Sequence, residues 1–191
     1  MSEVQVVLNT RRETTMAGPQ TGDGRNRIEV ATFAAGCFWG TEVAYRNLPG
    51  VVSTEVGYSG GSTSNPSYRE VCSGDTGHVE CVRVLFDPEV TSYGRLLEVF
   101  WSIHDPCSLD RQGPDTGSQY RSVIFFHSIE QEREAAASRD RLEQDGNCGR
   151  GKVVTEIKPV AAFYRAEEYH QRYFEKKGVA SSEHSCVCRP H

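Results

Sequence analysis

The sequence predicts a single α+β domain built as a two-layer sandwich of a sheet and helices. Segments with the alternating or β-branched pattern of strands are interleaved with segments that have the apolar period of helices. The 191 residues are enough for one domain with a full hydrophobic core. We expect the folded domain over residues 28–177, with a disordered tail at 1–27 and a mobile tail at 178–191.

Each element is predicted from its own local pattern. Apolar β-branched runs and period-two alternation predict strands, and apolar residues at helical spacing predict helices. The predicted strands are 28–35, 51–58, 78–86, 120–127 and 152–157. The predicted helices are 37–48, 68–72, 93–104, 129–144 and 166–176. The helix at 93–104 has the clearest amphipathic stripe, which we expect to pack in the core.

Composition and charge exclude several classes of function. The chain has 21 basic and 26 acidic residues and no long basic run, so nucleic acid is not expected as a partner. No stretch approaches the roughly 20 apolar residues of a membrane helix, and residues 1–27 lack a secretory apolar segment. We expect a cytoplasmic monomer, with organellar targeting by the arginines of the N-terminal tail left open.

The 7 cysteines do not have the dense, even spacing of a disulfide scaffold. We therefore expect free thiols in a reducing compartment, a few of them catalytic. The cysteines without any paired spacing, which we expect to be structural, are Cys72, Cys81, Cys107 and Cys148.

The strongest chemical signal is Gly-Cys-Phe-Trp-Gly at 36–40. Cys37 stands between a predicted strand and a predicted helix, where the helix start favours a thiolate over a thiol. The two glycines permit close approach of backbone, and Phe38 and Trp39 place large rings beside the sulfur. The pattern indicates a nucleophilic cysteine at the mouth of an apolar pocket. On composition alone, a buried core cysteine is the alternative.

Further motifs follow this cysteine in a fixed order. They are Gly-Tyr-Ser-Gly-Gly at 57–61, Asn-Pro-Ser-Tyr at 65–68, Cys-Ser-Gly-Asp-Thr-Gly-His-Val-Glu at 72–80, His-Asp-Pro at 104–106 and Gln-Tyr-Arg-Ser at 119–122. Together these motifs resemble the A-type peptide methionine sulfoxide reductases, from about residue 28 to residue 174. The resemblance implies a ferredoxin-like core and thiol-dependent reduction of methionine (S)-sulfoxide, with repair of oxidised proteins. Activity on free methionine sulfoxide is left open.

Reduction of a sulfoxide by a thiol needs a low-pKa cysteine and an acid that is neutral near pH 7. Cys37 fits the first role. Glu80 fits the second, because alternation along the strand 78–86 places it on the apolar face, where desolvation raises a carboxyl pKa. The alternative for Glu80 is a surface or salt-bridged glutamate.

The resemblance also implies roles around these two residues. Tyr68 and Tyr120 would hydrogen-bond the sulfoxide oxygen, while Phe38 and Trp39 would hold the methyl group of the substrate. Asp115 matches a family aspartate near the site, although the proline before it stands where many relatives have asparagine.

The predicted product of attack is a sulfenic acid on Cys37, which a second thiol must condense with. Cys186 and Cys188 are the candidates, although relatives separate their recycling cysteines by a longer Gly-rich segment, and the order of reaction is open. A thioredoxin-type dithiol would supply electrons, since the chain has no nucleotide-binding glycine fingerprint. The expected partners are thioredoxin and oxidised proteins or peptides, with no cofactor and no metal.

Two other functions stay open at this point. The first is a zinc-binding protein, although Cys-x-Cys is tighter than the usual zinc knuckle. Its ligands would be His184, Cys186, Cys188 and His191. The second is a cysteine hydrolase in which His78 or His104 activates Cys37. A hydrolase needs histidine beside the sulfur, whereas a reductase needs Glu80 there.

Overall fold

The computed structural model describes residues 28–146 and 152–178. The strands are β1 Glu29–Ala35, β2 Val51–Ser59, β3 Val79–Phe86, β4 Arg111–Gln112, β5 Asp115–Thr116, β6 Ser122–Phe126, β7 Glu156–Pro159 and β8 Tyr164–Arg165. The helices are α1 Phe38–Arg46, α2 Tyr68–Cys72, α3 Tyr93–Ser102, α4 Ile129–Gln144 and α5 Tyr173–Lys176, with a 3-10 turn η1 at Ser118–Tyr120. Apart from Gly178, the two predicted tails lie outside the described residues.

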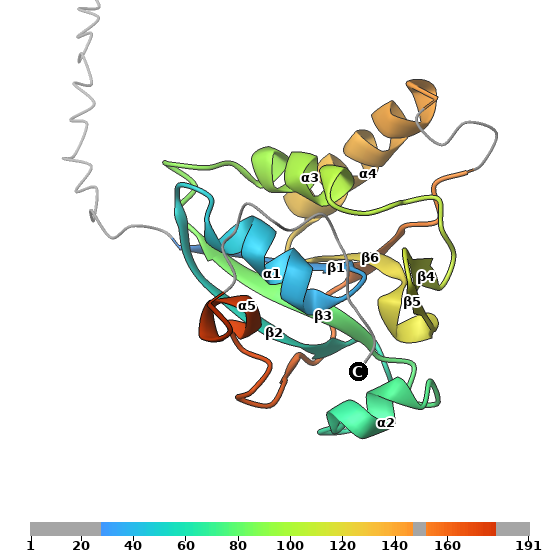
Figure 1. The fold of residues 1–191 in the computed structure, drawn as a ribbon. Helices are drawn as coiled ribbons and strands as arrows, with labels where there is room; N and C mark the ends of the chain where they lie inside the picture. Colours follow the sequence, from blue (N-terminus) through green and yellow to red (C-terminus); the bar gives the residue numbers. More distant parts are fainter. Residues whose placement is uncertain (1–27, 147–151, 179–191) are drawn as a thin grey trace, which may run out of the picture.

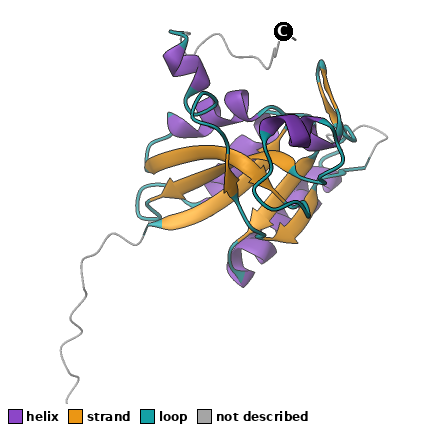
Figure 2. Ribbon diagram, turned by 90° about the horizontal axis from the view of Figure 1, so that it is seen from below, coloured by secondary structure: helices purple, strands orange, loops and turns teal. Residues whose placement is uncertain are grey.

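The main sheet has the strand order β7-β6-β1-β3-β2-β8 (Figure 1). Apart from α2 and the β4–β5 hairpin, the chain runs β1-α1-β2-β3-α3-β6, and these strands are antiparallel neighbours in the order β6-β1-β3-β2. This is the ferredoxin-like arrangement, so the predicted two-layer α+β fold is confirmed. β7 pairs in parallel with β6, and β4 and β5 form a separate hairpin outside the main sheet (Figure 2).

Helices α1 and α3 lie on the same face of the sheet and bury the main core (Figure 1). The Phe33 ring of β1 stacks on Tyr45 of α1 at a centroid distance of 5.0 Å and lies 5.4 Å from the Phe100 ring of α3. Strand β3 contributes Val82, Val84 and Phe86 to this core. Glu80 precedes them in the same alternation and is 2% exposed, so its prediction on the apolar face is confirmed.

Serine side chains cap helices α2, α3 and α4. Ser67 accepts a hydrogen bond from the Glu70 N–H in a capping box, and Ser92 and Ser128 accept from the N–H three residues further on. These local signals explain why α2 and α4 have the predicted boundaries. Helix α3 ends at Ser102, two residues before the predicted end.

The prediction of one helix over residues 166–176 is wrong, because only α5 at its end is helical. Upstream, the Ala166 N–H donates to the Val56 carbonyl, and the Gln171 side chain bonds both backbone groups of Val56. These bonds hold the backbone against the edge of β2. Arg172 then has a φ of +50°, which a right-handed helix cannot include.

Two strand boundaries also differ from the predictions. For the strand predicted at 120–127, Tyr120 belongs instead to η1, and β6 begins after it. For the strand predicted at 152–157, the Val154 N–H donates to the Pro106 carbonyl, so this part of the chain pairs with a loop. The strand β7 therefore forms later, at Glu156–Pro159, where it reaches β6.

The expectation of free thiols is wrong at Cys107, which is disulfide-bonded. Sequence spacing had no signal for this bond, because a disulfide depends on proximity in space. Cys72 and Cys81 are free, the first exposed and the second buried. Cys148 lies outside the described residues.

Candidate active site

Cys37 lies between the end of β1 and the start of α1, as predicted, and is 7% exposed. It occupies the N-cap position of α1, where the positive end of the helix dipole favours a thiolate. Gly36 before it has a φ of +88°, and a Cβ there would lie 2.8 Å from side-chain carbons of Gln112. Both conditions require glycine, so this turn positions the cysteine tightly.

Glu80 lies directly beside this turn. Its Oε2 accepts a hydrogen bond of 3.0 Å from the N–H of Phe38, the residue that follows Cys37. The pKa of Glu80 is raised from 4.5 to about 8, chiefly by burial, with the Phe38 N–H lowering it and the charge of Asp115 raising it. The site therefore combines a cysteine at a helix start with a carboxyl group that is mostly protonated at neutral pH.

Three further predicted residues lie near Glu80: Tyr68 of α2, Tyr120 of η1 and Asp115 of β5. Burial raises the pKa of both phenols, and the negative charge of Glu80 raises both further. The charges of Cys37 and Asp115 also raise the pKa of Tyr120. Tyr120 is therefore close enough to Cys37, Glu80 and Asp115 to interact electrostatically with each, and Glu80 interacts in the same way with Asp115. Phenols with a raised pKa keep their proton and can donate a hydrogen bond.

The two aromatic residues predicted for substrate binding directly follow the cysteine and lie in different environments. Phe38 is 1% exposed, whereas Trp39 is partly exposed. The Trp39 indole stacks on Tyr173 at 3.7 Å with an interplanar angle of 5°, and its Nε1 donates to His170 Nδ1 at 3.1 Å. The His170 ring lies 4.5 Å from Tyr68, so these rings form a continuous aromatic wall beside the cysteine.

Sequence reasoning missed the part of this wall that comes from residues 166–173. His170 and Tyr173 fix Trp39, and Glu167 accepts hydrogen bonds from the Tyr68 N–H at 2.9 Å and from a tyrosine hydroxyl of β2. The available signal was the density of Tyr, His and Phe in a short polar segment. We interpreted it as the face of a helix, whereas it packs on α1.

His78 and His104 make hydrogen bonds elsewhere. His78 accepts from the Gly61 N–H and bonds the Thr63 carbonyl, while His104 bonds Ser122 and a backbone carbonyl of α3. Burial lowers the pKa of His104 to about 4. His78 and His104 are thus bonded to other groups, whereas Glu80 is bonded to the Cys37 turn, and this favours the reductase arrangement over a hydrolase that uses either of these two histidines.

The tail residues of the sequence predictions lie outside the described residues. These are the recycling candidates Cys186 and Cys188 and the further zinc candidates His184 and His191. Among residues 28–146 and 152–178, no group of three or more His, Cys, Asp or Glu is arranged to hold a metal ion. Within the same ranges, no helix has the length and apolar character to cross a membrane.

Comparison with known proteins decides the family. Residues 29–189 match the family model described as peptide methionine sulfoxide reductase. The chain belongs to this family. The MsrA protein of Methanosarcina mazei is 59% identical over 169 residues, which cover 88% of this chain and 78% of the relative.

Solved structures agree with this assignment. Methionine sulfoxide reductase A of Corynebacterium diphtheriae is 37% identical with a TM-score of 0.77, covering 82% of this chain and 78% of that one. Mxr1 of Saccharomyces cerevisiae in complex with Trx2 is 29% identical with a TM-score of 0.54, covering 76% and 84%. The resemblance seen in the motifs is thus confirmed, and the enzyme class is that of a peptide-methionine (S)-S-oxide reductase.

Proposed function

We propose that this reductase converts methionine (S)-sulfoxide in oxidised proteins to methionine through a covalent cycle on Cys37, with Glu80 as the acid. The observation that carries the proposal is the 3.0 Å hydrogen bond from the Phe38 N–H to Glu80. It fixes a buried carboxyl of raised pKa next to a cysteine at a helix start. A thiolate and a neutral acid are the two groups that sulfoxide reduction needs.

In the first step, the Cys37 thiolate attacks the sulfoxide sulfur while Glu80 donates its proton to the oxygen. The sulfur–sulfur bond made in this attack then breaks as the hydroxyl passes from the substrate sulfur to the sulfur of Cys37. The substrate leaves as methionine, Cys37 is left as a sulfenic acid, and Glu80 is left as a carboxylate. The substrate gains two electrons and Cys37 loses two. Tyr68 and Tyr120 donate hydrogen bonds to the oxygen, and Asp115 supports the protonated state of Glu80 through its charge.

The substrate methyl group rests against Trp39 and Phe38 in this proposal. The support is the orientation of the indole, which stacks on Tyr173 and bonds His170 so that its plane is fixed before substrate arrives. A fixed aromatic face reduces the entropy lost when the substrate binds.

The second half of the cycle regenerates the thiolate. Cys186 attacks the sulfenic sulfur of Cys37, water leaves, and a disulfide forms; Cys188 then exchanges with it to give a disulfide that a thioredoxin dithiol reduces. The Trx2 complex of the yeast relative Mxr1 supports thioredoxin as the donor. The substrates are oxidised proteins and peptides, and the enzyme acts as a monomer in the cytoplasm.

The experiment is one turnover on a methionine-sulfoxide peptide without reductant, followed by peptide mapping by mass spectrometry. With one equivalent of substrate we expect one equivalent of methionine, consumption of only the S epimer, and a disulfide that joins Cys37 to Cys186 or Cys188 or, after exchange, Cys186 to Cys188. The control variant Cys37→Ser forms no methionine. Equal loss of both epimers would contradict the assignment to an S-specific reductase. A bridge from Cys37 to Cys72, Cys81, Cys107 or Cys148 would contradict the tail mechanism alone.

A double variant separates the two halves of the cycle. Replacing Cys186 and Cys188 together by serine should preserve the first equivalent of methionine but stop turnover with thioredoxin. Continued turnover in that double variant would show that another thiol resolves the sulfenic acid.

A further inference from the structure

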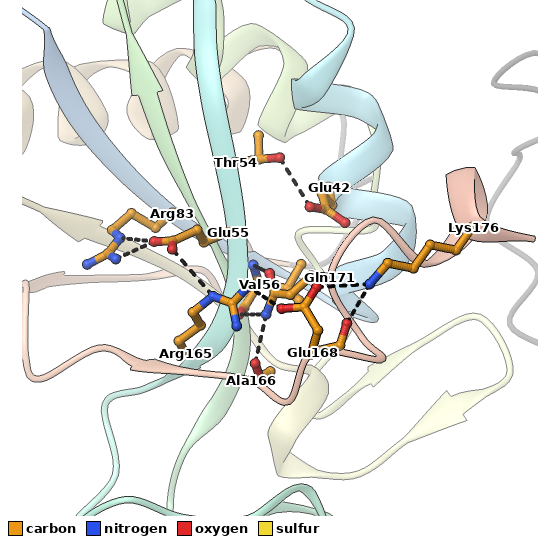
Figure 3. Close-up of polar contacts among 10 residues, drawn as sticks. All are labelled: Glu42, Thr54, Glu55, Val56, Arg83, Arg165, Ala166, Glu168, Gln171 and Lys176. Carbon is orange, nitrogen blue, oxygen red and sulfur yellow. Dashed lines mark hydrogen bonds and ion pairs between the residues drawn. The ribbon is translucent and has the colours of Figure 1, made fainter.

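Residues 166–173 contribute His170 and Tyr173 to the aromatic wall of the site. Up to residue 172 this segment forms neither helix nor strand. Their positions are determined by hydrogen bonds from side chains. Gln171 is buried, accepts from the Val56 N–H at 3.0 Å and donates to the Val56 carbonyl at 2.9 Å (Figure 3). Its amide also donates to the Ala166 carbonyl at 2.8 Å, so it replaces a strand partner where β8 ends.

A second hydrogen-bonding side chain comes from α1. Glu42 is 0% exposed, and the Thr54 hydroxyl of β2 donates to its Oε1 at 3.1 Å (Figure 3). Its Oε2 accepts from the backbone N–H of Arg172 at 2.9 Å. Arg172 is the residue with a φ of +50°, and a non-glycine residue keeps that conformation only where its surroundings determine it.

The spacing along α1 connects this carboxylate to the active site. Trp39, Glu42 and Arg46 recur at intervals of three and four, so they share one face of the helix. Trp39 contacts the rings of His170 and Tyr173, on either side of Arg172 in the sequence. Glu42 bonds the Arg172 N–H, and Arg46 pairs with Glu175 at 2.9 Å. Glu42 is the fully buried contact in the middle of this series.

We propose that Glu42 is a positioning residue of this reductase. By accepting the Arg172 N–H it holds His170 and Tyr173 against α1, and these two rings fix the plane of the Trp39 indole. Glu42 touches no reacting atom and acts through Trp39, so the inference rests on the proposed role of Trp39 in binding the substrate.

What this role requires is an acceptor that reaches Arg172, not a negative charge. Glutamine in place of Glu42 keeps both hydrogen bonds, because its oxygen can accept from Arg172 and its NH2 group can donate to the Thr54 hydroxyl, which is also an acceptor. Aspartate keeps the charge but is one methylene shorter, so the Arg172 N–H loses its acceptor on α1. The pair Glu42→Gln and Glu42→Asp therefore separates reach from charge.

The first readout uses no substrate. The chain has 2 tryptophans, so a Trp101→Phe background leaves Trp39 as the only source of indole fluorescence. We expect acrylamide quenching of Trp39 to be unchanged in Glu42→Gln and to rise in Glu42→Asp. Thr54→Val, which removes only the β2 bond to the same carboxylate, should give a smaller rise in the same direction.

The second readout is steady-state reduction of a methionine-sulfoxide peptide. We expect KM to rise about tenfold in Glu42→Asp with kcat within about twofold of wild type, because the loss is in binding geometry. Glu42→Gln should match wild type. The control Glu55→Gln alters a neighbouring glutamate that pairs with Arg83 and Arg165 (Figure 3), and it should change neither readout.

The outcomes decide between alternatives. Wild-type behaviour of Glu42→Asp in both readouts, or equal impairment of the glutamine and aspartate variants, would overturn the proposal, as would a fall in kcat with an unchanged KM. Unfolding in urea checks that each variant is folded, and the Thr54→Val result decides the matter if Glu42→Asp is not. A wild-type enzyme without reductase activity would instead contradict the proposed function and leave the quenching result valid.

Discussion

Replacing Glu80 by glutamine should separate the chemistry of the site from the stability of the fold. The amide oxygen can still accept the Phe38 N–H, so the turn at Cys37 is retained. The amide has no acidic proton to give, and general acid catalysis is worth roughly two to four orders of magnitude. We therefore expect the single-turnover rate of methionine release to fall by roughly 10²- to 10⁴-fold.

The pH dependence follows from the raised pKa. With a pKa of about 8, Glu80 is about 90% protonated at pH 7, whereas a carboxyl with a pKa of 4.5 would be less than about 1% protonated. Ionisation of Glu80 should therefore not limit the wild-type single-turnover rate below about pH 8, and above that pH the rate should fall about tenfold per pH unit. The glutamine variant should lack this alkaline limb.

Stability should also fall as pH rises, but over a lower pH range than the rate. Because the folded pKa lies above the unfolded one, the folded state holds a proton between pH 4.5 and about 8 that the unfolded state has released. The free energy of unfolding of wild type should accordingly decrease across this window, by at most about 1.4 kcal/mol per pH unit. The total is about 5 kcal/mol as an upper limit, from the difference between a pKa of 4.5 and one of about 8.

Urea unfolding of wild type and Glu80→Gln at pH 4.5, 6.5 and 8.5 measures this difference. We expect the glutamine variant to gain relative stability at each step as pH rises. Parallel stability curves for the two proteins, or a single-turnover rate within a few-fold of wild type, would refute the assignment of Glu80 as a buried neutral acid.

Other variants test the surroundings of the same site. Tyr68→Phe and Tyr120→Phe should each slow single-turnover reduction by about 10²-fold, because each removes one donor to the developing oxyanion; a rate within a few-fold of wild type would place that phenol outside the step. Gly36→Ala should destabilise the protein to urea by about 1–3 kcal/mol, because a Cβ at a φ of +88° meets Gln112; an unchanged midpoint would contradict this. Ser67→Ala should cost about 1 kcal/mol in the same assay through loss of the α2 capping box, and a cost near zero would show that α2 is held by other contacts.

Most elements of the core could be predicted because they carry their information locally, whereas their ferredoxin-like arrangement was implied by the family resemblance. The alternation in β3 predicts which side chains face the helices, Glu80 included. The serine before α4 marks the start of that helix, and its end before Gly146 is equally local. β7 was misplaced because a short strand at the sheet edge is determined by its partner β6, not by its own pattern.

Residues 166–173 could not be predicted, because distant residues determine their conformation. Gln171 bonds Val56, which is 115 positions away, and Arg172 bonds Glu42, which is 130 positions away. The aromatic spacing in this segment satisfied the local pattern of a helix, but tertiary contacts outweighed it. Cys37 and Glu80 could be identified from the sequence because local motifs mark them. His170 and Tyr173 could not, because distant residues place them at the site.

The acid strength of Glu80 is a property of the packing of α1 over β3. Burial is the largest cause of its raised pKa, and the Phe38 ring, which is 1% exposed, belongs to the core that buries it. The N–H of the same residue acts in the opposite direction by stabilising the ionised carboxylate. The free energy that it would cost to ionise Glu80 in the folded state is the free energy that keeps it protonated at neutral pH. The activity and the stability of this reductase are therefore coupled through one side chain.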